Sequence, residues 1–295
     1  MMQVSILMPV YNEKLYLSEA VESVARQTKD LSLEVICVDD FSTDDTWSLM
    51  VELQKKYSFL KCYKNDKKGK NNAFNYAYHK SCGAVIILLA GDDKLVEETL
   101  HLRVEPVIMA DEASISLSKY KTFSKVAYLN GMVVPKKPEL GSLSGGTIAF
   151  NRRFADLIFP IPPVLSNEDM WINCHVKYNS DVRIVHVPVV ALLYRLHENN
   201  SLKRNVSFNE KNRMISTRSI VYSVFLEKYR CFLPDQEREC LARLAALETL
   251  RANRSLVSVL FFKNVALLDR IRALVYASPL LHWIHMRMQK WTAGN

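Results

Sequence analysis

The chain has 295 residues, of which 49% are hydrophobic and 24% charged, a composition typical of a globular protein and not of a disordered one. Its net charge of +8 is unevenly placed: residues 203–295 hold 16 Lys and Arg against 7 Asp and Glu, which leaves 23 against 24 in residues 1–202. This balance argues against a nucleic-acid groove on the main part of the chain, and the basic C-terminal part favours an anionic membrane surface or an acidic partner.

Cysteine spacing and the first residues bear on the compartment. The six cysteines form no Cys-x-x-Cys pair, and Cys37 falls inside an apolar run, which favours reduced thiols in a cytosolic protein. Residues 1–8 lack a positively charged leader, and no apolar run reaches the roughly 18 residues of a spanning helix. We therefore expect a cytoplasmic protein without a cleaved signal peptide.

Strand and helix patterns alternate over the first 93 residues. Apolar runs at 4–10, 33–38, 59–63 and 84–89 predict strands, and helical spacing of apolar residues follows each of the first three. The run at 84–89 is the most apolar, as expected for a strand covered on both faces of a parallel sheet. This alternation predicts the βαβ arrangement of a doubly wound nucleotide-binding domain.

Paired carboxylates follow two of these strands. Asp39 and Asp40 end the second strand, and Asp92 and Asp93 end the fourth. Ligands of open α/β sheets bind beyond the carboxyl ends of such strands. Adjacent carboxylates repel each other unless a cation lies between them or a polyol binds them, and oxygen ligands suit Mg²⁺ or Mn²⁺ carrying a phosphate. A solvated turn or helix cap is the alternative.

A basic loop, residues 65–72, precedes the third helix. It contains three lysines, of which Lys70 lies next to the expected start of the helix. A basic loop at a helix N-terminus favours a phosphate, and Lys70 is the candidate ligand. A solvated turn accounts for the same lysines without a ligand.

Beyond residue 93 the pattern predicts a mixed sheet. In chain order we expect a helix over 95–109, a strand over 126–134, a strand after Gly145-Gly146, a helix of about ten residues from Glu168-Asp169, and strands over 182–187 and 189–194.

From residue 203 onward the pattern is helical. We expect two parts, an α/β domain over 1–202 and a basic helical region over 203–295. Apolar residues interleaved with basic ones toward the end, around 280–290, resemble an interfacial membrane helix. Helices that pack on the domain, or on a twin subunit in a homo-oligomer, are the alternative.

The order of the motifs resembles a known family. The motifs are Met8-Pro9-Val10-Tyr11-Asn12-Glu13, Val38-Asp39-Asp40-Phe41-Ser42-Thr43-Asp44, Gly69 to Asn75, Gly91-Asp92-Asp93, Gly146-Thr147, Glu168-Asp169 and Tyr194-Arg195-Leu196-His197. Over roughly residues 2–201 the chain resembles the family 2 glycosyltransferases of bacterial surface polysaccharides. The resemblance implies the GT-A fold, a Rossmann-like mixed α/β sheet flanked by helices, here with a C-terminal helical extension.

The resemblance also implies roles for individual residues. The nucleotide-sugar contacts would be Pro9, Tyr11, Glu13, Asp39, Lys70 and Asp92, with Tyr11 against the base, Asp39 on the base edge and Asp92 on the ribose. Asp93 and His197 would hold Mn²⁺ or Mg²⁺, Asp169 would be the general base, and Gly146, Glu168 and Trp171 would contact the donor or acceptor sugar.

Local structure alone can account for some of these residues. Without the resemblance, Glu168 and Asp169 are equally well understood as acids favoured by a helix dipole, and His197 as a structural histidine. The chain also departs from the family at two places. Its sequence Lys70-Asn71-Asn72-Ala73-Phe74-Asn75 lacks the usual Ala-Arg-Asn run, and Gly91-Asp92-Asp93 stands in place of Asp-x-Asp.

The implied activity is inverting transfer of a hexosyl or N-acetylhexosaminyl group from a UDP-linked donor to a glycan or lipid-linked acceptor. The setting would be synthesis of a surface polysaccharide such as lipopolysaccharide, in the cytoplasm at the inner face of the membrane. A nucleotidyltransferase is one alternative, but it usually needs a glycine-rich basic loop where Pro9 to Glu13 stand. A non-catalytic scaffold that binds sugar nucleotides is the other, although the acids for metal and base are present.

Overall fold

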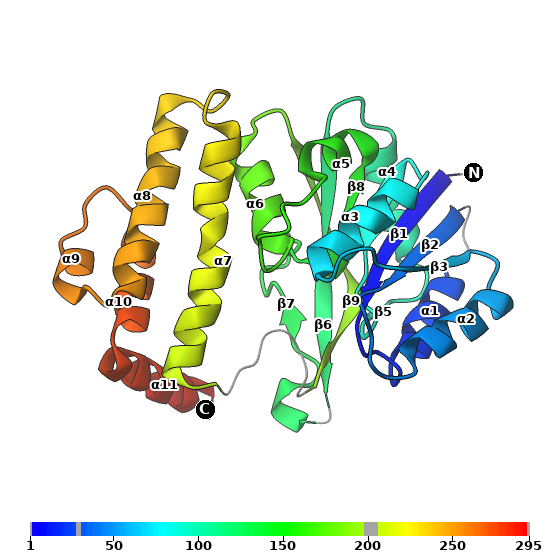
Figure 1. Cartoon of the computed structure of the whole chain (residues 1–295), viewed down its shortest axis with the longest axis horizontal. Helices are drawn as coiled ribbons and strands as arrows, with labels where there is room; N and C mark the ends of the chain where they lie inside the picture. The colour runs from blue at the N-terminus through cyan, green and yellow to red at the C-terminus, as the bar shows by residue number, and fades with distance from the viewer. Residues whose placement is uncertain (1, 28–30, 125, 198–205, 294–295) are drawn as a thin grey trace. The chain divides into compact units, whose positions relative to one another are not determined.

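The computed structural model describes residues 2–27, 31–124, 126–197 and 206–293. It divides the chain into two compact units, Met1–Asn200 and Ser201–Asn295. The predicted boundary between residues 202 and 203 lies outside the described residues. Figure 1 shows strands and helices in the first unit and helices in the second.

The first unit is built from alternating strands and helices. Its strands are β1 (Met2–Val10), β2 (Leu31–Asp39), β3 (Leu60–Lys64), β4 (Val85–Leu88), β5 (Lys94–Leu95), β6 (Ser114–Ser124), β7 (Val133–Val134), β8 (Ile148–Asn151) and β9 (Arg183–Leu196). Its helices are α1 (Leu17–Ala25), α2 (Thr46–Lys56), α3 (Lys70–Lys80), α4 (Leu100–Ile108), α5 (Arg152–Ile158) and α6 (Asp169–Tyr178), with short 3₁₀ helices η1 (Ala127–Leu129) and η2 (Gly145–Thr147).

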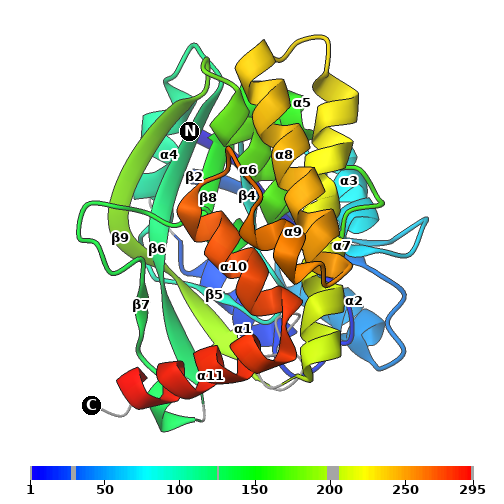
Figure 2. The ribbon, with the colours of Figure 1, turned by 90° about the vertical axis from the view of Figure 1, so that its left-hand side faces the viewer.

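In the described part of this unit, nine strands form one sheet. The order is β3-β2-β1-β4-β8-β6-β9-β5, with β7 paired to β6. Strands β3, β2, β1 and β4 are parallel, whereas β8 runs antiparallel to both β4 and β6. Figure 2 shows the long strands β6 and β9 side by side. The sheet is therefore mixed beyond the fourth strand, as the sequence predicts.

Helices cover both faces of the sheet. One apolar cluster joins α1, α2 and α4 to alternate side chains of β1, β2 and β4, among them Ile6, Val35 and Ile87. Helix α3 packs on β1 and β2 from the other face, and α5 packs on β4. All four residues of β4 are buried because helices cover both faces of the sheet there. A strand in this position must be apolar throughout, as β4 is.

Three predicted elements differ in the structure. The helix predicted over 95–109 begins at Leu100, because Leu95 belongs to β5 and pairs with β9. The strand predicted over 126–134 is instead η1 followed by the two-residue β7. The two strands predicted around Pro188 are one strand, β9. Its register against β6 shifts where Pro188 lies, which accommodates a residue without a backbone N–H.

The second unit consists of five helices in its described residues. They are α7 (Phe208–Tyr229), α8 (Asp235–Ala252), α9 (Leu256–Leu260), α10 (Leu267–Ala277) and α11 (Pro279–Ala293). A small apolar cluster of Leu247, Val259 and Ala273 joins α8, α9 and α10. None of the helices that the structure describes is both long enough and apolar enough to cross a bilayer.

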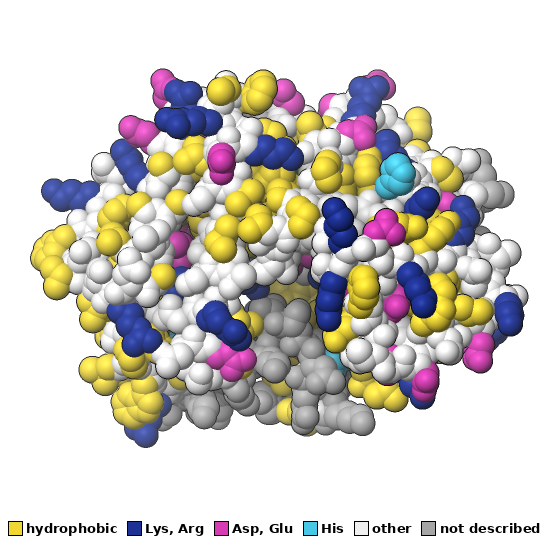
Figure 3. Space-filling model, viewed as in Figure 1, with side chains coloured by type: hydrophobic (Ala, Val, Ile, Leu, Met, Phe, Trp, Pro, Cys, Tyr) yellow, Lys and Arg dark blue, Asp and Glu magenta, His cyan; other side chains and the backbone are white. Residues whose placement is uncertain are grey.

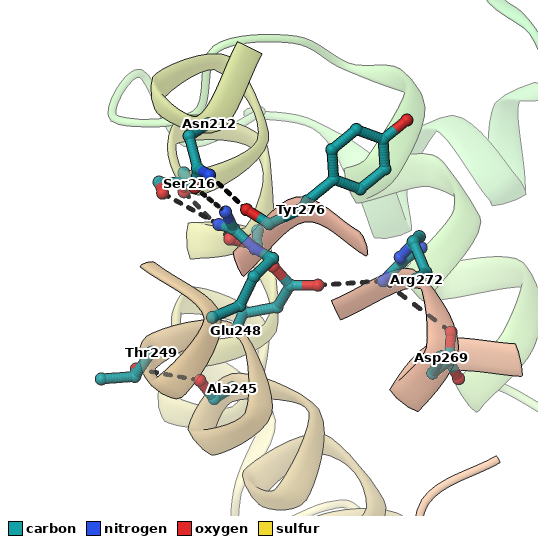
Figure 4. A network of polar contacts seen from close by, with 10 residues as sticks. Asn212, Ser216, Ala245, Glu248, Thr249, Asp269, Arg272 and Tyr276 are labelled. Atoms are coloured by element: carbon teal, nitrogen blue, oxygen red, sulfur yellow. Dashed lines mark hydrogen bonds and ion pairs between the residues drawn. The ribbon is translucent and has the colours of Figure 1, made fainter. Parts of the chain in front are cut away.

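A buried ionic network also holds the second unit together (Figure 4). The guanidinium of Arg251 in α8 lies 2.5 Å from Glu248 and donates to Ser216 of α7 at 2.9 Å. Arg272 of α10 reaches the other Glu248 oxygen at 2.9 Å. Asn212 of α7 accepts from Arg251 and donates to the Tyr276 carbonyl. The network thus connects α7, α8 and α10 and leaves the buried charge of Arg251 paired.

A second buried carboxylate ties the parallel strands of the first unit. Glu34 of β2 accepts a hydrogen bond from Ser5 of β1 at 2.5 Å, from Lys61 of β3 at 2.8 Å and from the Cys82 N–H at 2.7 Å. Burial alone would raise the pKa of Glu34, but these hydrogen bonds outweigh burial and lower the pKa from 4.5 to about 2. All six cysteines, including Cys82, are free thiols.

We expect Glu34→Gln to lower the free energy of unfolding at pH 7 by about 1–2 kcal/mol, a figure that allows for solvent screening. Because the folded pKa is below the unfolded value, this stabilisation is present above about pH 5 and is lost as the pH falls toward 2. Urea unfolding at pH 7 and pH 3 measures the difference. Glu52→Gln on the exposed side of α2 is the control. An equal loss of unfolding free energy in both variants would contradict the stabilising role of the Glu34 hydrogen bonds.

Candidate functional site

Two loops at the carboxyl edge of the sheet are tied together by Asn12. This residue follows β1 and has a φ of +56°, a conformation that asparagine tolerates better than most residues. Its amide oxygen accepts from the Thr43 N–H at 2.8 Å, and its own N–H donates to the Ser42 hydroxyl at 3.0 Å. The loops after β1 and β2 therefore form one wall, and Tyr11 projects from it with 45% of its surface exposed.

Asp40 fixes the basic loop to the same edge. Its carboxylate accepts from the Asn65 amide at 2.8 Å and from the Gly69 N–H at 2.7 Å. Gly69 has a φ of +130°, which favours glycine, and Lys70 begins α3 directly after it. The neighbouring Asp39 is buried and accepts from the Ser42 N–H at 3.2 Å. Of the two acids after β2, Asp40 thus anchors the loop that carries Lys70.

Arg195 holds the turn that contains the second pair of acids. Its backbone N–H donates to Asp93 at 2.8 Å, and its guanidinium donates to the Asp92 carbonyl at 2.8 Å. The guanidinium also lies 3.1 Å from Glu19 and 4.3 Å from the ring centroids of Tyr16 and Phe123. The last strand of the unit therefore fixes the acidic turn after β4.

His197 faces Asp92 and not Asp93. Its Nε2 lies 3.0 Å from an Asp92 carboxylate oxygen, and its ring lies 5.0 Å from that of Tyr16. Asp93 is 4% exposed and uses a carboxylate oxygen to accept from Arg195. Asp92 is thus the acid paired with His197, and Asp93 is the more buried of the two. The predicted metal role of Asp93 and ribose role of Asp92 stay predictions.

Negative charge is concentrated around Asp92. Burial, and then the charges of Asp92 and Asp44, raise the pKa of Glu13 to about 8, so this carboxyl is protonated at neutral pH. Burial and the charge of Asp92 also raise the pKa of Asp93. Such crowding favours a bound cation, and carboxylate oxygens suit Mn²⁺ or Mg²⁺. In the described residues no three acid, His or Cys side chains converge into a complete metal cage.

Lys70 connects this acidic turn to the acids at the start of α6. Its ammonium lies 2.9 Å from Glu168, whose side chain is buried, while the Lys70 side chain is 43% exposed. Crowding by protein atoms would lower the pKa of Lys70, but the charges of Glu168, Asp169 and Asp92 outweigh this effect and raise the pKa. The Lys70 ammonium is therefore near enough to Asp92 and to both acids of α6 for their charges to raise its pKa.

The start of α6 is also fixed by the turn η2. The Gly145 N–H donates to the Asp169 carboxylate at 3.0 Å. A Cβ at Gly145 would lie 3.1 Å from a Glu168 oxygen, a closer approach than nine in ten real Cβ contacts. The lack of a side chain at Gly145 is therefore explained by the two acids that lie against it.

Burial corrects one of the predicted contacts. The Trp171 side chain has 0% of its surface exposed and donates to the Ile158 carbonyl at 2.8 Å, so its ring belongs to the core and cannot contact a sugar. Pro9 is buried within β1, and a Cβ at Gly146 would lie 2.6 Å from the Leu192 side chain. Contacts of Pro9 and Gly146 with the donor or acceptor stay predictions. The sequence could not show burial, because a surface aromatic and a core aromatic look alike.

Asp40 and Arg195 are absent from the residues predicted for the site. Both stand next to predicted residues in the motifs, so proximity in sequence was the available signal. Their roles depend on partners far along the chain, Asp40 on Gly69 and Arg195 on Asp93, and the spacing of residues does not reveal such partners.

Comparison with known proteins finds a family model that matches part of the first unit. Residues 5–133 match the model of the family described as glycosyl transferase family 2. The chain is 32% identical to the poly(ribitol-phosphate) beta-glucosyltransferase of Bacillus spizizenii over 138 residues, 46% of this chain and 21% of that protein. It is 25% identical to an Escherichia coli UDP-Glc:alpha-D-GlcNAc-diphosphoundecaprenol beta-1,3-glucosyltransferase over 218 residues, 71% of this chain and 83% of that protein.

A third relative is the dolichol-phosphate mannosyltransferase of Pyrococcus furiosus, 28% identical over 125 residues, 42% of this chain and 35% of that protein. The chain thus spans well under two thirds of the length of the Pyrococcus and Bacillus relatives.

Solved structures share the fold. S. aureus TarS in complex with UDP-GlcNAc superposes with a TM-score of 0.59 at 19% identity, covering 97% of this chain and 88% of that chain. The mannosyltransferase PcManGT of Pyrobaculum calidifontis, in complex with GDP-Man and Mn²⁺, gives 0.58 at 16% identity, covering 99% and 85%. The predicted GT-A fold is confirmed.

Proposed function

We propose that this chain, whose residues 5–133 match the model described as glycosyl transferase family 2, transfers a sugar, with inversion, from a nucleoside diphosphate donor to a glycan or lipid-linked acceptor. The observation that carries the proposal is the position of Lys70. Its ammonium is influenced by Asp92 at the end of β4 and by Glu168 and Asp169 at the start of α6. A donor bound at the sheet edge would therefore have an acid on the acceptor side.

The donor would lie across the loops after β1 and β2. Tyr11 offers an exposed ring to the base, and Asp39 lies at the end of β2 for the base edge. Lys68 lies over the Tyr11 ring at 5.3 Å, and Lys70 follows it, so positive charge is present for a diphosphate. UDP is the nucleotide we propose, and support comes from the relative named for UDP-Glc and the TarS complex with UDP-GlcNAc.

Asp92 and His197 would hold Mn²⁺ or Mg²⁺, which as a Lewis acid stabilises the negative charge of a departing diphosphate. Glu13 lies beside Asp92, whose charge together with burial raises the pKa of Glu13 to about 8. Asp93 keeps the turn in place through Arg195. We propose these residues as the leaving-group side of the site.

Asp169 would be the general base. Its carboxylate is oriented by the Gly145 N–H and can take the proton from an acceptor hydroxyl as that oxygen attacks the anomeric carbon. The bond from carbon to the diphosphate oxygen breaks as the new glycosidic bond forms. Attack from the face opposite the leaving group inverts the configuration. Lys70 and Glu168 neutralise each other beside the base.

We also propose that the acceptor is linked to a lipid. Among the relatives, the E. coli enzyme is named for a diphosphoundecaprenol acceptor and the Bacillus enzyme for poly(ribitol-phosphate). We propose a bacterial polysaccharide precursor of this kind for the present chain, and the second unit carries a surface that suits a membrane. Of the 23 large hydrophobic side chains exposed in the described residues, 12 lie between Leu256 and Met288, so this surface is concentrated in one segment.

Helices α10 and α11 each expose large apolar side chains in their described residues. Leu267, Leu268 and Ile271 are exposed on α10, while Ala273 and Ala277 on its other side are buried. Leu280, Ile284 and Met288 recur at intervals of four along α11 and are exposed as well. We call the exposed apolar residues of 256–288 the apolar surface of the second unit.

Basic residues accompany this surface. Residues 254–290 contain six Lys and Arg against one Asp. Figure 3 shows dark blue basic side chains beside yellow hydrophobic ones over α9 and α11. Arg287 lies over the ring of Trp283 at 4.1 Å. Positive charge beside exposed apolar side chains matches an anionic lipid surface, where the apolar groups enter the interface and the cations meet the headgroups.

Asp169→Asn should lower the rate of transfer at least about 100-fold while donor affinity stays unchanged, because an amide cannot take the acceptor proton. Transfer kinetics with a UDP-sugar, together with donor binding by calorimetry, measure both. Asp181→Asn, at an exposed turn of the same unit, is the matched control. A folded Asp169→Asn protein with normal transfer would refute the proposed base.

A thermal-shift panel of UDP-, GDP- and dTDP-sugars with and without Mn²⁺ tests the donor and the metal. We expect the largest rise in Tm with a UDP-sugar and Mn²⁺ together, about 2.7 kcal/mol of stabilisation at 100 times the dissociation constant. Asp92→Asn should lose the part that depends on Mn²⁺, whereas Asp111→Asn at an exposed position should keep it. If Asp93→Asn lost the Mn²⁺-dependent rise in Tm and Asp92→Asn kept it, Asp93 and not Asp92 would be the metal ligand.

Leu268→Glu should weaken binding to vesicles of phosphatidylcholine and phosphatidylglycerol about 10-fold, because it removes one apolar side chain from the interface. Leu268 is 80% exposed, and Phe232→Glu in the loop between α7 and α8, where Phe232 is 84% exposed, is the matched control. Sedimentation with vesicles measures binding. Equal binding to neutral vesicles, or self-association of the chain that Leu268→Glu abolishes, would identify the surface as a different interface.

A further inference from the structure

The segment that leads to Asp169 runs along α3 in the opposite direction. Four contacts join them in order: Tyr78 stacks on Phe159 with ring centroids 4.2 Å apart, Asn75 bonds Ile161, Asn71 bonds Leu165, and Lys70 bonds Glu168. The helix positions fall by three and then four residues, about one turn each, and by one residue at the last step, as the segment advances. The segment is thus attached to the helix from its C-terminal end to its first residue.

Asn75 makes the most specific of these contacts. Its amide nitrogen donates to the Ile161 carbonyl at 2.8 Å, and its amide oxygen accepts from the Ile161 N–H at 2.7 Å. Because residues 160, 162 and 163 are prolines, Ile161 alone among 160–163 has a backbone N–H to donate. A ladder of backbone hydrogen bonds therefore cannot fix this stretch, and the side chain of Asn75 supplies both partners instead.

Asn71 repeats the arrangement one turn earlier in the helix. It is 3% exposed and donates to the Leu165 carbonyl at 2.8 Å. Residues 71 and 75 lie on the same face of α3 because they are four positions apart. Asp169 follows Leu165 by four residues, so the second attachment is close to the base along the chain.

Helix α3 also belongs to the donor side of the site. Gly69, which precedes it, is held by Asp40 at the end of β2, and α3 packs on β1 and β2. The helix is therefore fixed to the strands whose loops would bind the donor. A segment attached along the helix takes its position from the same strands.

We propose that Asn71 and Asn75 are positioning residues that set the place of the Asp169 carboxylate relative to the donor. The inference rests on the proposed function, in which Asp169 is the base, and it adds two residues that touch neither donor nor acceptor. Loosening the segment moves the base and leaves the loops after β1, β2 and β4 intact. Since a displacement of about 1 Å can cost on the order of 100-fold in rate, the effect belongs in kcat and not in donor affinity.

The experiment compares three alanine variants of the same helix. Asn75→Ala and Asn71→Ala should lower kcat for transfer about 10- to 100-fold and leave the Kd of a UDP-sugar with Mn²⁺ within about twofold. Asn72→Ala is the matched control, because the Asn72 amide lies between the other two in sequence and donates to the Lys68 carbonyl at 3.0 Å. It should retain kcat.

A fourth variant keeps the test decisive if an alanine variant does not fold. Asn75→Asp can still accept from the Ile161 N–H but cannot donate to its carbonyl, so it should recover part of the lost kcat. Unchanged kcat in Asn75→Ala and Asn75→Asp would overturn the inference. So would a loss of donor affinity as large as the loss of kcat, because that pattern means disruption of the whole helix.

Asp169→Asn is measured in parallel. If Asp169→Asn retains transfer, the proposed function fails whatever the asparagine variants do. If Asp169→Asn is inactive and Asn75→Ala transfers as well as Asn72→Ala, the positioning role alone fails.

Discussion

The site depends on one electrostatic constraint, the gathering of carboxylates at the carboxyl edge of a parallel sheet. Asp92 and Asp93 are adjacent, and Glu13 lies close enough to Asp92 for the pKa of Glu13 to rise to about 8. Glu168 and Asp169 act on the same lysine, Lys70, as Asp92 does. Like charges at such distances destabilise the fold unless cations or protons compensate them. The protein supplies both, in Lys70 and Arg195 and in the proton on Glu13.

The two cations reach the edge from different parts of the chain. Lys70 begins α3 and pairs with Glu168, whereas Arg195 lies near the end of β9 and fixes the turn of Asp92 and Asp93. Each cation therefore closes a long loop of chain around the site. This arrangement explains why the acidic turn and the start of α6 keep a definite geometry although neither lies inside a strand.

Helix α3 links the two halves of the proposed chemistry. Its first residue carries the cation, and the side chains of Asn71 and Asn75 bond the proline-rich segment that ends at Glu168. The second unit uses buried polar groups in a different way. There Arg251 and Glu248 connect three helices around a small apolar cluster, and large hydrophobic side chains of α10 and α11 are left at the surface. Those exposed side chains are the basis of the proposed membrane-facing surface.

The sequence by itself determined the parallel half of the sheet, the mixed sheet after it, the helical C-terminal part and the edge at which the acids gather. It could do so because buried parallel strands must be continuously apolar, and the residues after them then fall at one edge. Its errors arose where a distant partner decided the outcome. Leu95 became a strand by pairing with β9, and β9 continued past Pro188 because its register against β6 could shift.

Only the tertiary structure decided which way individual side chains face. The sequence shows Asp92 and Asp93 as equals, but Arg195, about a hundred residues away, takes Asp93 into the interior and leaves Asp92 beside His197. Trp171 looks like a sugar-stacking ring until α5 and α6 enclose it. Burial and orientation depend on contacts between segments far apart in the chain, and the local pattern of residues, which fixes strands and helices, carries no record of those contacts.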